Sequence, residues 1–138
     1  MNYKKWLIED LSELERLRFA CGQIREELQT VRTEIDAIRA GGRDGERREW
    51  LLDAGARMQD MERNLAATEK HVADMDRLLA GLPETERKVI EGMYVRPGQR
   101  AALDLAAALG YETAQIYRIK DRALGHLAQM RYGVGWRT

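Results

Sequence analysis

Arginine and glutamine side chains recur along one side of a helix predicted for residues 113–131. Gln115, Arg118 and Arg122 are separated by three and four residues, which places them within reach of one another on an α-helix. Glutamine and arginine form paired hydrogen bonds with the edges of adenine and guanine in the major groove of DNA. The spacing therefore predicts a helix that reads base sequence. The alternative is a cationic helix face that is merely solvated.

Four neighbouring residues complete the predicted DNA-binding set. Thr113 and Lys120 carry a hydroxyl and an amine that suit phosphate oxygens, and Tyr117 belongs to the same outward face. The carboxylate of Glu112 either accepts a hydrogen bond from a cytosine amino group or repels phosphate. Because glutamate is not a preferred capping residue, Thr113 is the alternative cap, which would shift the helix start by one residue.

A helix-turn-helix is the element expected to present this face. Its pattern is a small or apolar residue at each position where two helices cross or the chain turns: Leu105, Ala106, Leu109, Gly110, Ile116 and Ile119. Ala106 is small enough for a close crossing, and Gly110 permits the turn. We expect a helix over residues 100–109 before the turn, preceded by another over about residues 83–95.

Residues 3–80 carry the apolar pattern of a coiled coil. In the first segment the apolar residues alternate in steps of three and four: Leu14, Leu17, Cys21, Ile24, Leu28, Val31, Ile35 and Ile38. After the glycine-rich segment 41–45 the same steps recur: Leu51, Ala54, Met58, Met61, Leu65, Thr68, Val72, Met75 and Leu79. Two such helices, the first over about residues 3–40, predict an antiparallel hairpin.

A two-helix hairpin buries only one stripe of each helix, so we expect this one to associate. The leading expectation is a homodimer with a four-helix core, the second is binding to another protein, and the third is a monomeric spacer. The residues predicted to form this oligomerisation seam are Leu14, Leu17, Ile24, Leu28, Val31, Ile35, Leu51, Met58, Met61, Leu65, Val72 and Met75.

Composition favours an all-α fold with two parts. Only 7% of the 138 residues are aromatic, and phenylalanine occurs once and proline twice, which argues against a β-sandwich or a doubly wound α/β domain. The expected division is a coiled-coil hairpin over residues 1–81 and a helix-turn-helix domain over residues 82–138.

The zero net charge conceals an uneven distribution. Residues 1–80 hold 14 cationic and 17 anionic side chains, whereas residues 81–138 hold 9 and 6. From residue 115 onward Asp121 is accompanied by five cations: Arg118, Lys120, Arg122, Arg131 and Arg137. This basic end predicts modest DNA affinity with strong salt dependence.

Several classes are disfavoured by the residue inventory. One cysteine and two histidines do not suffice for a structural zinc site, and no nucleophile, phosphate-binding loop or paired carboxylate points to an enzyme. We therefore expect no catalytic activity, metal or cofactor. The lack of an apolar run of about 18 residues predicts no membrane contact and a cytoplasmic location.

The C-terminal segment resembles region 4 of sigma-70-type factors. The resemblance covers about residues 82–133 and is carried by LPETERKVI (82–90), MY (93–94), DLA (104–106), LGY (109–111), IYRIK (116–120) and RALGHL (122–127). In particular the segment looks like short phage-encoded regulators of the ArpU and RinA type, which implies the cytoplasm of a bacterial host cell as the location. The resemblance implies a transcriptional regulator whose third helix enters double-stranded DNA at a promoter-like element, with RNA polymerase as a possible second partner.

Two other functions compete with transcription regulation. Phage DNA-packaging subunits of the small-terminase kind also join a helix-turn-helix to helical oligomerisation elements. A coiled-coil adaptor or scaffold protein would use the hairpin to capture a partner and the helix-turn-helix only as structure.

Overall fold

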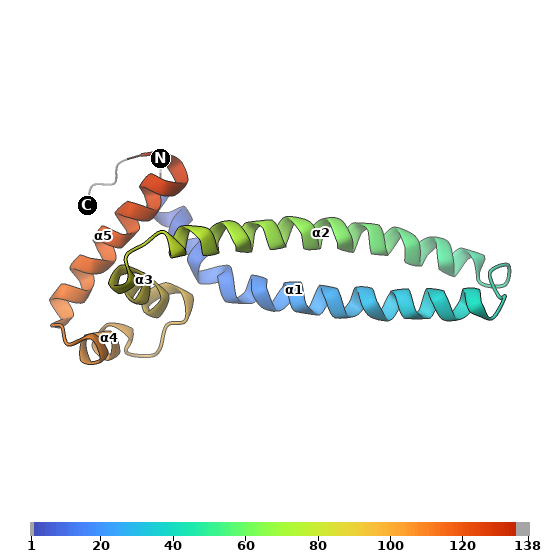
Figure 1. The fold of residues 1–138 in the computed structure, drawn as a ribbon, viewed down its shortest axis with the longest axis horizontal. Helices are drawn as coiled ribbons and strands as arrows, with labels where there is room; N and C mark the ends of the chain where they lie inside the picture. Colours follow the sequence, from blue (N-terminus) through green and yellow to red (C-terminus); the bar gives the residue numbers. More distant parts are fainter. Residues whose placement is uncertain (1, 135–138) are drawn as a thin grey trace. The chain divides into compact units, whose positions relative to one another are not determined.

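The computed structural model describes residues 2–134, and all its regular elements are helical (Figure 1). The helices are α1 (Tyr3–Ala40), α2 (Arg48–Ala80), α3 (Glu84–Ile90), the π-helical turn η1 (Glu91–Val95), α4 (Ala101–Leu109) and α5 (Thr113–Tyr132). The all-α prediction is confirmed. The first helix has the predicted bounds, and the other helix ends lie close to them, except between α3 and η1. None of the helices in the described residues is long and apolar enough to cross a membrane.

The chain forms two compact units. One unit combines the residues up to Glu15 with those from Ala73 onward, and the other is the helical arm, residues 16–72. The boundaries between the units thus follow Glu15 and precede Ala73, whereas the sequence predicted a single boundary between residues 81 and 82. An uninterrupted apolar seam gave no sign of this division, because the same helices continue from one unit into the other.

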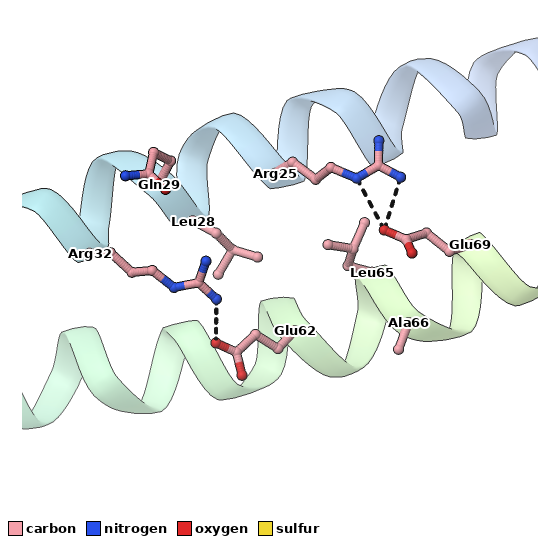
Figure 2. Close-up of a pocket in the computed structure, with 8 residues that line it drawn as sticks. All are labelled: Arg25, Leu28, Gln29, Arg32, Glu62, Leu65, Ala66 and Glu69. Atoms are coloured by element: carbon pink, nitrogen blue, oxygen red, sulfur yellow. Dashed lines mark hydrogen bonds and ion pairs between the residues drawn. The ribbon is translucent and has the colours of Figure 1, made fainter.

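Two ion pairs join α1 to α2 within the helical arm (Figure 2). Arg25 Nη2 lies 3.0 Å from Glu69 Oε1, and Arg32 Nη2 lies 3.1 Å from Glu62 Oε1. A step of seven residues forward in α1 is thus matched by seven residues backward in α2. The two helices of the arm consequently run antiparallel in a defined register.

The seam residues of the arm cover one another within a single chain. Leu28, Val31 and Ile35 on α1 are buried, as is Ala54 on α2, and Met58 packs against the same cluster. Every residue of the predicted oligomerisation seam is buried or half-buried in the structure, none exposed. The seam therefore supplies the core between the two helices and needs no second chain for that purpose.

The first residues of α1 belong to the other unit. Leu7, Leu11 and Leu14 are fully buried there. Arg131 of α5 pairs with Asp10 at 3.0 Å. Two further contacts hold this segment in place. Arg96 forms an ion pair of 2.9 Å with Glu15, and the ring of Tyr3 contacts the ring of Tyr132. These contacts explain why the N-terminal residues cluster with the C-terminal helices.

The remaining core lies among α3, α4 and α5. Val89, Ala106, Ile116 and Ile119 form its buried cluster, and partly buried side chains pack around it: Met93, Ala102, Leu105 and Leu109. The apolar residues selected from the sequence at the crossing of α4 and α5 all belong to this core. Gly110 ends α4 in the left-handed conformation, with φ +75°, which favours glycine.

The predicted helix over residues 83–95 is interrupted at its midpoint. After α3, the backbone widens into η1, where the Arg96 amide donates to the Glu91 carbonyl five residues earlier. A side chain on Gly92 would place its Cβ 2.8 Å from a methyl carbon of Leu105, so glycine allows α4 to pack closely here. Apolar spacing does not reveal one extra residue in a helical turn, which is why the sequence suggested a continuous helix.

Candidate nucleic-acid interface

Helix α5 has one face in the core and one face in solvent. Its buried residues are Ile116, Ile119, Ala123, Leu124, Leu127 and Ala128. Ala114, Tyr117, Arg118 and Arg122 are exposed on the other side. The core contacts thus fix the rotation of α5 about its axis, and this rotation presents two of the predicted DNA-binding arginines outward.

The beginning of α5 differs from one of the sequence interpretations. Glu112 occupies the N-cap position with extended backbone, φ −76° and ψ 154°, and its side chain makes no capping hydrogen bond. Thr113 is the first helical residue and not the cap, so the suggested one-residue shift is wrong. The exposed carboxylate of Glu112 stands beside the half-buried Thr113 at the end of the helix where backbone amides point outward.

Gln115 and Arg118 interact directly. The Arg118 Nε–H donates a hydrogen bond to Gln115 Oε1 at 3.0 Å. Arg118 is exposed, whereas Gln115 is half-buried. The structure therefore brings together two residues that the sequence placed on one side of the helix. The contact engages the oxygen of the glutamine amide and leaves its nitrogen as a donor.

Arg122 extends the exposed face by one turn beyond Arg118. Residues four apart lie nearly above one another on a helix, so Ala114, Arg118 and Arg122 form a stripe along α5. Ala114 was not among the predicted DNA-binding residues. Its exposed methyl group adjoins the polar side chains, and apolar groups in such positions contact thymine methyls in DNA complexes.

The side chain of Lys120, predicted to contact phosphate, is mostly buried. Its side chain retains 15% of its exposed area, its amine lies 3.1 Å from Asp121 Oδ1, and it stands over the ring of Tyr117 at 5.4 Å. Burial raises the pKa of the Tyr94 hydroxyl, an effect that the positive charge of Lys120 opposes and the negative charge of Asp121 reinforces. The Lys120 amine thus interacts with side chains of its own unit, namely Asp121, Tyr117 and Tyr94.

Not all of the cations that the sequence places from residue 115 onward are accessible in the structure. Arg131 pairs with Asp10, and its Nη1 also lies 2.7 Å from the sulfur of Met75. Arg137 lies outside the described residues. Within α5, all of which the structure describes, the exposed cations are Arg118 and Arg122. The candidate interface therefore depends on two arginines.

No protein-family model, curated protein or solved structure matches this chain. Functional inference consequently rests on the geometry of α5 and on the sequence resemblance.

Glu86 and His126 form a contact that sequence reasoning missed. Glu86 lies in the first turn of α3, where the helix dipole favours its negative charge, yet only 6% of its surface is exposed. His126 Nδ1 of α5 lies 2.7 Å from Glu86 Oε1. The His126 imidazole thus faces a carboxylate. The 40-residue separation left no local signal for this pairing.

A groove also runs along the helical arm between the two ion pairs of Figure 2. It has a volume of about 370 Å³, and Leu28 and Leu65 lie between the two charged pairs. Its four charged side chains are engaged across the helices. The groove is open to solvent, and its charges already neutralise one another.

Proposed function

We propose that the chain is a sequence-specific DNA-binding regulator of transcription. In this proposal α4, the turn 110–112 and α5 form a helix-turn-helix, and α5 enters the major groove. The observation that carries the proposal is the exposed stripe of Ala114, Arg118 and Arg122, which lies opposite the buried face of the same helix. The core holds the helix, and Arg118 and Arg122 stay exposed.

The chemistry of this stripe fits base recognition. A guanidinium donates two parallel hydrogen bonds to the O6 and N7 atoms of guanine. Arg118 is the first candidate for that contact, because it lies in the N-terminal half of α5, and recognition helices contact bases with their N-terminal residues. Arg122, one turn further along, is suited to a second base or to a phosphate.

The sequence resemblance to region 4 of sigma-70-type factors, and to phage regulators of the ArpU and RinA type, supports the same function. It also motivates RNA polymerase as a second partner. We place both partners on residues 82–134, because the exposed cations of α5 and the resemblance fall in that part of the chain.

Homodimerisation through the helical arm is part of the proposal. Since the seam is covered within one chain, the arm would use its outer surface. Phe19 and Leu52 retain 70% and 67% of their exposed area, the highest values among the exposed large apolar side chains of the described residues. A second copy that covers these residues would also bring two DNA-reading helices together and raise affinity through bivalent binding.

In vitro selection of bound DNA from a random pool tests the DNA-binding proposal. We expect an enriched sequence motif that contains at least one guanine. In a gel shift, Arg118→Ala with Arg122→Ala should abolish binding to the selected site, while circular dichroism shows an unchanged helical content. Arg63→Ala is a matched control, because Arg63 pairs with Asp60 in the arm.

Two results would contradict the proposal. One is a selection that enriches no motif. The other is a double variant at Arg118 and Arg122 that binds the selected DNA as tightly as the unchanged chain.

An assembly function is the second candidate, and the exposed Phe19 and Leu52 of the arm favour it. A DNA-packaging subunit or a scaffold would associate into larger particles than a regulator. Mass photometry distinguishes them, because a ring of many copies supports packaging, whereas a dimer supports the regulator.

A further inference from the structure

The hydrogen bond between Gln115 and Arg118 limits what each side chain can do at a base edge. The Arg118 Nε–H donates to Gln115 Oε1 at 3.0 Å, and the donor is a nitrogen with no acceptor capacity. The amide oxygen of Gln115 is therefore the partner by chemical necessity. To recognise adenine through two hydrogen bonds, glutamine must accept from N6 and donate to N7. That accepting oxygen already holds the hydrogen bond from Arg118 Nε–H on one of its two lone pairs, so an adenine N6 would have to share the same atom with Arg118.

We propose that Gln115 is a positioning residue that orients Arg118 toward a guanine and does not itself read adenine. This inference rests on the DNA-binding function proposed above. With Nε held by the glutamine, the two terminal nitrogens of the guanidinium stay free, and together they match guanine O6 and N7. Gln115 is half-buried on α5, and its amide oxygen supports the exposed guanidinium from the helix surface.

The benefit of this support is a reduced loss of side-chain freedom on binding. An arginine on an open helix face samples many conformations, and immobilising such a side chain weakens binding by about two- to tenfold. A guanidinium already held by Gln115 has lost part of that freedom in the unbound protein. Removing the support should weaken DNA binding by about two- to tenfold while the preferred base stays the same.

A double-mutant cycle measures this relationship. The four proteins are the unchanged chain, Gln115→Met, Arg118→Ala and the combination, assayed on the selected DNA and on each single-base variant of that site. Methionine keeps the length of the side chain and removes the accepting oxygen. We expect Arg118→Ala to lose the preference for one guanine, with a loss of roughly five- to 150-fold. Gln115→Met should weaken binding about two- to tenfold with the guanine preference retained.

The decisive comparison is Gln115→Met in the Arg118→Ala background, where we expect no further loss. Equal, additive losses in both backgrounds, or a lost preference at an adenine position, would overturn the inference while leaving DNA binding intact. Failure of the unchanged chain to select any sequence would overturn the proposed function and the inference together. Gln129→Met is the matched control, because Gln129 is exposed later in α5, beyond Arg122.

Discussion

Glu86 and His126 join α3 to α5 around a buried carboxylate. The His126 Nδ1 atom lies 2.7 Å from Glu86 Oε1 and 3.1 Å from Oε2, and only Oε2 meets it with hydrogen-bond geometry. Within the described part of the chain, the shielded Oε1 has no hydrogen-bond partner. A carboxylate taken out of water is costly unless it is paired, so this contact makes α3 depend on α5.

Replacing His126 with alanine should destabilise the protein. The variant leaves the Glu86 carboxylate buried without its partner, so we expect the free energy of unfolding to fall by about 1–3 kcal/mol. Urea denaturation followed by circular dichroism measures this change. The control replaces both residues with apolar ones, Glu86→Met with His126→Leu, and should recover most of the loss. A double variant as unstable as His126→Ala would argue against the pairing.

Two glycine substitutions should have opposite effects on stability. A Cβ at Gly92 would lie 2.8 Å from Leu105, so Gly92→Ala overpacks the contact between η1 and α4. We expect it to destabilise the protein by about 1–3 kcal/mol. Gly22 lies within α1, and apart from its chain neighbours and the nearby backbone of the same helix no described atom comes within 4 Å of the position that a Cβ would take there, so Gly22→Ala should stabilise by about 0.5–1 kcal/mol. Thermal denaturation should show a lower melting temperature for Gly92→Ala and a higher one for Gly22→Ala. Melting temperatures that shift in the same direction would contradict this packing.

Reversing one charge between the arm helices should be repaired by reversing the other. Arg25→Glu places a carboxylate opposite Glu69 and removes an ion pair whose side chains are 58% and 42% exposed. Because the pair is accessible to water, we expect a loss of only about 0.2–1 kcal/mol, which Glu69→Arg should restore in the double variant. Urea denaturation of the single and double variants at low salt gives the coupling free energy between residues 25 and 69. A double variant no more stable than Arg25→Glu would indicate that the register does not depend on this pair.

Phe19→Glu separates the stability of the arm from its association. Since Phe19 is 70% exposed, the unfolding free energy should change by no more than about 0.5 kcal/mol. If a second copy covers this side chain, the dimer dissociation constant should rise about tenfold or more, in line with the burial of one aromatic side chain. Sedimentation velocity measures the dimer fraction. Gln23→Glu, four residues further along α1, controls for the added charge, and an unchanged dimer fraction would exclude Phe19 from the interface.

Local sequence patterns were sufficient to predict most of the helices. Alternating steps of three and four residues predicted the long helices, and Gly110 marked the turn before α5. The π-helical turn at Gly92 was not predictable, because it depends on how closely Leu105 approaches the backbone. The burial of Glu86 was not predictable either, since its partner His126 is 40 residues away.

The sequence by itself determined the helical class, the heptad seams and the set of cations available to α5. Helix propensity and apolar periodicity act over a few residues, so they are readable without a structure. Only the tertiary structure decided which of those cations stay accessible. Arg131 is paired with Asp10, and Lys120 is held by its own neighbours, whereas Arg118 and Arg122 remain exposed. The packing of α5 against residues far away in the chain selects among side chains that look equivalent in sequence.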